Sequence, residues 1–283
     1  MKNLFAMEIG DLNEENETSY GEADRFVLRR VEADLSEKQD ELNGELEEHQ
    51  KNAELPPWLN IVRMVSLLLF LIVFSATVKA GFSTAMKNAP LLVVAGAISG
   101  IAALVLWLIG RSKTKSVIES EDFSEDVAAA EEMRKESLAA LAVPEDAVGT
   151  DVFMRTYKMK KGKEKRASSF FEYLNNEWLL FREDDMLCFA DCGGVIGISV
   201  LDITGIYKIN KRVSFMCWNK EEEFNKGKYK QYKITCDNVG TMYIKTYCSM
   251  RFVYCAEEYE ILFPAYELET FKRLTGAPVK EAE

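Results

Sequence analysis

Two cysteines in the stretch "MLCFADCGGVIGI", residues 186–198, come nearest in type and spacing to a reactive centre. A disulfide would need their Cα atoms within ~7 Å, and shared metal ligation also needs close approach. In an extended strand, which rises ~3.3 Å per residue, the Cα atoms of Cys188 and Cys192 would lie about 13 Å apart. Gly193 and Gly194 favour a turn after Cys192 rather than between the thiols. The stretch therefore predicts a β-hairpin whose thiols are bystanders.

The rest of the sequence offers little catalytic machinery. The six cysteines contain no C-x-x-C pair, and the usual state of a free cysteine is that of a small buried hydrophobe, with zinc or redox roles as the alternative. They are Cys188, Cys192, Cys217, Cys236, Cys248 and Cys255. The one histidine, His49, is far from them in sequence, and phosphate-loop and nucleophile-elbow motifs are absent. We expect no catalytic residue, no metal and no cofactor; an enzyme with an unrecognised site is the alternative.

A basic run, "RTYKMKKGKEKR" at residues 155–166, is the strongest binding feature. Its basic residues are Arg155, Lys158, Lys160, Lys161, Lys163, Lys165 and Arg166. Such residues contact anionic lipid headgroups with a gain of about 1 kcal/mol for each one near the surface. The alternative is a solvated turn whose charges are balanced by neighbouring acidic residues.

Two segments of 21 residues, 58–78 and 90–110, are almost entirely apolar. At a rise of ~1.5 Å per residue each would form a helix about 31 Å long, which matches the hydrocarbon core of a bilayer. Near-unbroken apolar runs on both helices argue against a buried helix pair in a soluble protein. We predict a transmembrane helical hairpin over 57–110, in which the long side chain of Arg63 extends to the headgroups.

Small residues give the second span a face for close packing. Gly96 and Gly100 form a G-x-x-x-G motif, which allows two helix backbones to approach each other. We expect this face to pack either on the first span or on a second copy of the chain, forming a homodimer.

The charge is unevenly distributed around the predicted hairpin. Residues 1–56 contribute −10 and residues 111–146 contribute −5 to a net charge of −11, which disfavours nucleic acid as a partner. Basic residues near the outer ends of the spans outnumber those of the connection, which are Lys79 and Lys87. This bias predicts a multi-pass protein of the cell membrane with both termini in the cytoplasm.

Four further segments surround the hairpin. Residues 1–56 are predicted as an acidic region, disordered at its start, with an amphipathic helix over 22–51 that is either solvated or a dimerising coiled coil. Residues 111–149 read as an acidic helical stalk, 150–276 as a β-domain and 277–283 as a tail. Strands are expected at 152–159, 177–182, 186–190, 194–200, 204–209, 212–218, 229–236, 241–247 and 258–263, before an amphipathic helix that ends at Gly276.

Four stretches of the β-domain carry a family resemblance: the strand pairs "WLLFREDDMLCFAD" and "VIGISVLDITGIYKINK", the later "EEYEILFP" and the terminal "YELETFKRLTG". On these stretches, residues 150–276 resemble a bacterial PH-like (GRAM-like) domain attached to a pair of membrane helices. The resemblance implies an antiparallel β-barrel or sandwich with a terminal helix at one end. Some PH-like domains bind lipid or peptide, which the resemblance makes an expectation here.

These features predict an α+β membrane protein without catalytic activity. We expect a membrane-anchored scaffold or sensor whose cytosolic β-domain binds a protein partner or the anionic membrane surface. The alternative is an accessory subunit of a membrane transport or envelope-assembly complex that acts through its transmembrane helices. The expected partners are the lipid bilayer and a membrane or cytosolic protein.

Overall fold

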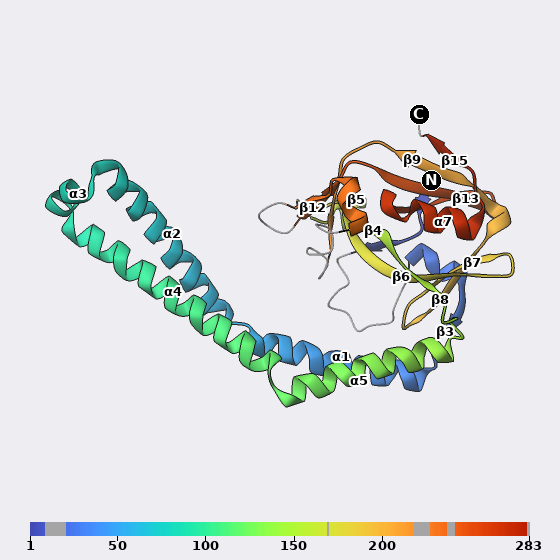
Figure 1. Ribbon diagram of the computed structural model, residues 1–283, viewed down its shortest axis with the longest axis horizontal. Coiled ribbons are helices and arrows are strands. Elements are labelled where there is room, and N and C mark those ends of the chain that lie inside the picture. Colours follow the sequence, from blue (N-terminus) through green and yellow to red (C-terminus); the bar gives the residue numbers. More distant parts are fainter. Residues whose placement is uncertain (9–20, 169, 218–226, 237–240, 282–283) are drawn as a thin grey trace. The chain divides into compact units, whose positions relative to one another are not determined.

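In the computed structural model the chain forms two compact units (Figure 1). The structure describes residues 1–8, 21–168, 170–217, 227–236 and 241–281. One unit, which we call the β unit, consists of Met1–Glu32 and Lys135–Glu283, and the other, the helical unit, is Ala33–Arg134. The β unit is therefore built from the two segments that flank the helical unit in sequence, a division that differs from the predicted segments.

The helical unit contains both of the predicted apolar helices. Its helices are α1 (Ala33–Ala53), α2 (Pro57–Ala80), α3 (Phe82–Asn88), α4 (Pro90–Ile118) and the first part of α5 (Glu121–Ala140). α2 and α4 pack against each other and each begins with proline, which suits the first helical position because the N–H there has no intrahelical partner. Both are long and apolar enough to cross a membrane, and only 6% and 11% of their most apolar windows are buried.

The N-terminal residues form strands where the sequence predicts disorder at the start and a helix from residue 22. They contain β1 (Lys2–Asn3), β2 (Ala6–Glu8), the 3-10 helix η1 (Gly21–Phe26) and β3 (Val27–Arg30). The helix predicted to begin at residue 22 begins at Ala33. That prediction was wrong because β3 finds an antiparallel partner, β8 (Gly194–Ser199), that local periodicity cannot show. The disorder predicted at the start of the chain was wrong for residues 1–8, where β1 and β2 pair with β14 and β4, and residues 9–20 lie outside the described residues.

A single sheet organises the β unit. Its further strands are β4 (Val148–Lys160), β5 (Lys163–Arg166), β6 (Tyr173–Glu183), β7 (Met186–Ala190), β9 (Ile203–Ile209), β10 (Val213–Met216), β11 (Thr235–Cys236), β12 (Thr241–Ile244), β13 (Tyr247–Tyr254), β14 (Glu257–Pro264) and β15 (Val279–Glu281). The strand order is β11-β12-β10-β6-β4-β14-β13-β9-β15, with β7 on β6 and β8 on β7. β1 and β2 add to β14 and β4 as parallel partners.

Two strand predictions need correction. The strand expected at 229–236 is mostly the 3-10 helix η3 (Gly227–Tyr232), with only Thr235–Cys236 in β11. The strand expected at 241–247 ends at Ile244, and Tyr247 begins β13, an eight-residue strand that the sequence pattern does not reveal. The end of the strand predicted at 212–218 lies outside the described residues.

The terminal helix α7 (Leu268–Thr275), which follows the 3-10 helix η4 (Ala265–Glu267), packs into the main core of the β unit. Phe271 of α7 is fully buried and stacks on Phe263 of β14, with 3.8 Å between ring centroids. Gly276 ends the helix with φ 67°, a left-handed conformation that glycine adopts without steric cost. Leu4 and Phe5 from the N-terminal segment lie in the same core.

Candidate functional site

The hairpin of β4 and β5 carries all seven basic residues predicted to contact lipid. Lys160 pairs with Lys163, so Lys161 and Gly162 form a two-residue turn, with φ of 55° and 68°. Two successive positive φ angles are typical of the turn that suits the right-handed twist of a hairpin. The local sequence thus holds the basic run in a defined register rather than in a loose loop.

The register divides the basic residues between the two faces of the hairpin. Lys158 lies opposite Lys165, and Lys160 lies opposite Lys163. Residues directly opposite share a face, and so do residues two apart along a strand. These four lysines therefore lie together on one face, which we call the lysine face.

The two arginines of the run lie on the other face and have partners within the chain. Arg155 donates to the carboxylate of Glu164 at 2.9 Å. Arg166 donates to the backbone carbonyl of Phe171 and lies 3.9 Å from the carboxylate of Glu172. The arginines thus stabilise the hairpin, and the lipid contact expected of the seven basic residues stays a prediction.

The lysine face is exposed, and its charge is not balanced locally. In the part of the chain that the structure describes, none of its four side chains has a hydrogen bond or an ion pair. Like charges directly opposite each other destabilise a β-ladder. The arrangement therefore carries an electrostatic cost that an external anion would relieve.

Gly96 and Gly100 pack inside the α2–α4 hairpin. A Cβ atom on Gly96 would lie 2.5 Å from Cγ1 of Val73, and one on Gly100 would lie 2.6 Å from Cδ2 of Phe70. Both contacts are with α2, so of the two arrangements expected from the sequence, the structure shows packing on the first span.

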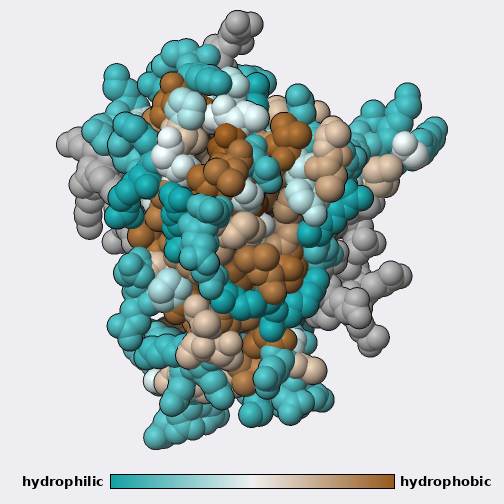
Figure 2. Space-filling view, turned by 90° about the vertical axis from the view of Figure 1, so that its right-hand side faces the viewer, coloured by the Kyte–Doolittle hydropathy of each residue, from teal (hydrophilic) through white to brown (hydrophobic). Residues whose placement is uncertain are grey.

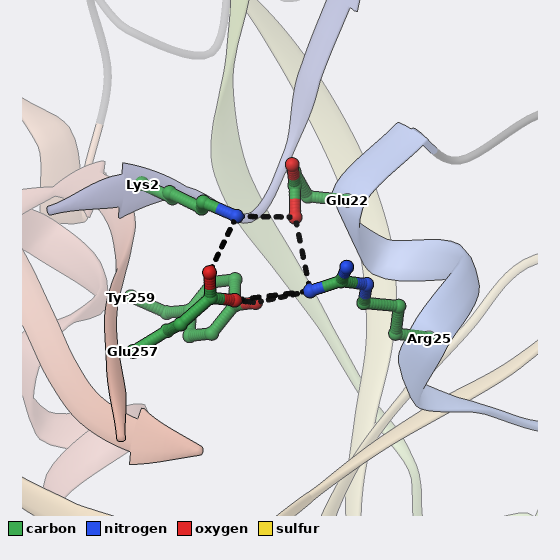
Figure 3. Close-up of polar contacts among 5 residues, drawn as sticks. All are labelled: Lys2, Glu22, Arg25, Glu257 and Tyr259. Atoms are coloured by element: carbon green, nitrogen blue, oxygen red, sulfur yellow. Dashed lines mark hydrogen bonds and ion pairs between the residues drawn. The ribbon is translucent and has the colours of Figure 1, made fainter. Parts of the chain in front are cut away.

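A cluster of charged residues around Tyr259 joins the N-terminal segment to β14, and sequence reasoning missed it (Figure 3). Glu257 accepts hydrogen bonds from Tyr259 at 2.7 Å, from Arg25 at 3.0 Å and from Lys2 at 3.1 Å. Glu22 lies 3.5 Å from Lys2. Two short apolar runs beside these charges, "LF" at residues 4–5 and "FVL" at residues 26–28, were the signal in the sequence that could have indicated the N-terminal strands. Glu257 has three donors within the cluster, whereas the buried Oε2 atom of Glu22 has ion-pair distances to Lys2 and Arg25 but no hydrogen bond. These contacts join segments that are far apart in sequence, which assigns the cluster to assembly of the β unit.

The Glu257 carboxylate makes the stability of the β unit sensitive to acid. Hydrogen bonds from Tyr259 and Lys2 lower the pKa of Glu257 from 4.5 to about 2. A lowered pKa in the folded state adds stability above pH ~4.5, and this stability is lost as the pH falls from there towards 2. The effect is modest because the Glu257 side chain is 42% exposed.

We expect Glu257→Gln to flatten the change in urea midpoint between pH 5 and pH 3. Glu258→Gln, which changes an exposed neighbour, serves as the control. An equally steep change in Glu257→Gln would contradict this assignment.

The cysteines are free thiols in three environments. Cys188, Cys217 and Cys248 are buried, Cys192 is half-buried, and Cys236 and Cys255 are exposed. The stretch that raised the question of a reactive centre is the β7–β8 hairpin, in which Ala190 pairs with Val195. Asp191 accepts hydrogen bonds from the N–H groups of Gly193 and Gly194 in its turn. Within the described residues, no three His, Cys, Asp or Glu side chains are grouped as metal ligands.

Burial is expected to divide the thiols by reactivity. It raises the pKa of Cys188 to about 11 and that of Cys248 to about 12, and the thiolate is the reactive form. At pH 7.5 a maleimide should modify Cys236 and Cys255 in the native protein, but Cys188 and Cys248 only after denaturation. Peptide mapping by mass spectrometry measures this, and rapid native labelling of Cys248 would count against the buried environment.

His49 lies in the helical unit, away from the cysteines in sequence. Its Nε2 atom is 2.8 Å from a carboxylate oxygen of Asp126, and its ring lies edge-on to Phe123. The pair joins α1 to α5 and is therefore a structural contact between the helices that lead into and out of the hairpin.

Comparison with known proteins adds no relative. No family model matches the sequence, and no match occurs among the curated proteins or the solved structures.

Proposed function

We propose that this protein is a membrane-anchored, non-catalytic scaffold or sensor whose β unit is a PH-like domain that rests its lysine face on the anionic membrane surface. The four lysines without a partner within the described chain carry this proposal. α2 and α4 form the anchor. The packing of α7 against the core agrees with the terminal helix of a PH-like domain.

The expected strength of this contact suits a reversible switch. Four lysines near an anionic surface contribute about 4 kcal/mol, which for a free ligand corresponds to a Kd of about 1 mM. The chain tethers the β unit to α2 and α4 through α1 and α5, and a short tether gives an effective concentration in the millimolar range. Bound and unbound states are then similarly populated. Because charges are screened over ~8 Å at physiological ionic strength, salt or lipid composition would shift the balance.

The construction of the β unit supports one membrane orientation. Its two segments flank α2 and α4 in sequence, so both must lie on the same side of a bilayer that these helices cross. The excess of basic residues at the outer ends of the helices favours the cytoplasmic side.

The test uses the full chain in lipid nanodiscs with and without phosphatidylglycerol. Hydrogen exchange of the backbone over 155–166 should slow when the anionic lipid is present and return to its original rate in about 0.5 M salt. Replacing Lys158, Lys160, Lys163 and Lys165 by Gln should abolish the difference, whereas replacing them by Arg should preserve it. Equal exchange in the neutral and anionic nanodiscs would refute the proposal.

A protein partner is the second candidate, on a different surface of the β unit. Figure 2 shows apolar side chains gathered on one face of the molecule within a hydrophilic surround. Among the exposed apolar residues of the β unit, Leu201 is 81% exposed on the 3-10 helix η2 (Val200–Asp202), and Val253 and Tyr254 are exposed on β13, which contacts η2. Purified partner binding that Leu201→Asp abolishes and the lysine substitutions leave intact would favour this candidate.

A further inference from the structure

Two adjoining hollows on the helical hairpin share residues but differ in chemistry. The first, the head pocket, has a volume of about 400 Å³ and is lined by Glu54, Asn60, Arg63, Trp107, Arg111 and Thr114 among others. The second, the tail groove, has a volume of about 920 Å³ and is lined mainly by apolar residues, including Met64, Leu67, Phe70, Gly100 and Leu104. Arg63 and Trp107 line both. A polar pocket thus continues into an apolar groove.

The head pocket presents two guanidinium groups. Among the described residues, Arg63 has no hydrogen bond or ion pair, and the contact of Arg111 is with the face of the Trp107 ring, 5.5 Å from its centroid. Glu54 lines the same pocket, so two cations face one carboxylate. Guanidinium groups bind phosphate with two parallel hydrogen bonds, and the excess positive charge favours an anion.

The polar groups beside the arginines help to shape this pocket. Asn60 donates to the carbonyl of Leu55 at 3.2 Å, and Thr114 donates to the carbonyl of Ala53 at 3.2 Å. The first bond holds the connection between α1 and α2 to the start of α2, and the second holds the end of α1 to α4. The guanidinium groups therefore stand out as the donors that remain for a ligand.

The length of the tail groove corresponds to one leaflet of a bilayer. On α2 it runs from Arg63 to Phe70, which is about 10 Å of helix, and on α4 from Trp107 to Ala97, which is about 15 Å. Half of a ~30 Å hydrocarbon core is about 15 Å. Arg63 lies six residues after Pro57, about 9 Å along α2, at a depth where its side chain reaches the headgroup region.

We infer that the helical hairpin binds one anionic glycerophospholipid, with its phosphate against Arg63 and Arg111 and one acyl chain in the tail groove. A basic pocket between transmembrane helices at their cytoplasmic end is a setting in which such headgroups bind. This site is separate from the lysine face, because it retains a single lipid molecule within the membrane rather than sensing the surface charge.

Native mass spectrometry of the full chain in neutral detergent tests this inference. After delipidation, phosphatidylglycerol should add back with one molecule per chain and at least tenfold tighter than phosphatidylcholine. Replacing Arg63 and Arg111 by Gln should weaken phosphatidylglycerol binding at least tenfold. Replacing Lys113 and Lys115 by Gln removes the same charge near the same helix end and should change the affinity less than threefold.

A second variant separates lipid binding from a simple anion site and guards against misfolding. Ala97→Phe should fill the tail groove and lower lipid occupancy while the arginines remain. Inorganic phosphate at 10 mM should not displace the lipid, and the glutamine substitutions on the lysine face should leave occupancy unchanged. Equal weakening by the two pairs of substitutions, displacement by phosphate, or full occupancy in Ala97→Phe would each overturn the inference.

Discussion

Replacing Phe5 by alanine is expected to destabilise the β unit by about 3–5 kcal/mol, a large part of the 5–15 kcal/mol that holds a typical domain folded. Phe5 is only 4% exposed, and its ring lies 4.9 Å from that of Trp178 and 5.4 Å from that of Phe189. The truncation would leave a cavity between strands that are far apart in sequence. Urea unfolding of the full chain in detergent, followed by near-UV circular dichroism, measures the loss.

Phe170→Ala provides the matched control for this prediction. Phe170 is 63% exposed, so the same truncation there should change stability by less than about 0.5 kcal/mol. If Phe5→Ala proved as mild as Phe170→Ala, the N-terminal segment would not belong to the core of the β unit.

Gly96→Ala is expected to separate α2 from α4 and to destabilise the hairpin by about 1–3 kcal/mol. The new Cβ would meet Val73 at both Cγ1 and Cβ, at 2.5 and 2.7 Å. Val73 is β-branched and keeps one rotamer in a helix, so it cannot swing aside and the backbones must move. Gly100→Ala should cost less, because the Phe70 ring that it meets can rotate. Unfolding by sodium dodecyl sulfate in mixed micelles measures both variants.

Ala95, an exposed residue of α4, supplies the comparison for the two glycines. Ala95 is exposed, so Ala95→Leu should leave the unfolding midpoint unchanged, whereas Gly96→Leu should lower it further than Gly96→Ala. A larger loss for Gly100→Ala than for Gly96→Ala would contradict the packing described here.

The elements that sequence reasoning predicted well are those determined by local chemistry. The spans at 58–78 and 90–110 lie within α2 and α4, although α4 continues to Ile118, over a stretch in which Arg111, Lys113 and Lys115 are good helix formers. The β7–β8 hairpin follows from two apolar strands around Gly193 and Gly194. The terminal helix follows from its apolar spacing and its glycine cap.

Elements stabilised by distant partners were not predictable in the same way. Leu28, Val31 and Leu35 have helical spacing, yet Val27–Arg30 is a strand because β8, more than 160 residues later, completes its ladder. The lysine face shows the same limit. The sequence located its residues, but only the strand register reveals that four lysines share one face while Arg155 and Arg166 are paired on the other.

The divided construction of the β unit sets the order of events during synthesis. Lys2 and Asn3 pair with Tyr259 and Glu260, so the ribosome makes about 250 further residues before that ladder can form. In the membrane arrangement proposed above, the first strands stay unpaired while α2 and α4 enter the bilayer. A chain that inserted only one of them would leave the two segments in different compartments, where the β unit could not close. Under this proposal, folding of the β unit would report that both helices have been inserted, and a chain that fails would expose its unpaired strands to proteolysis.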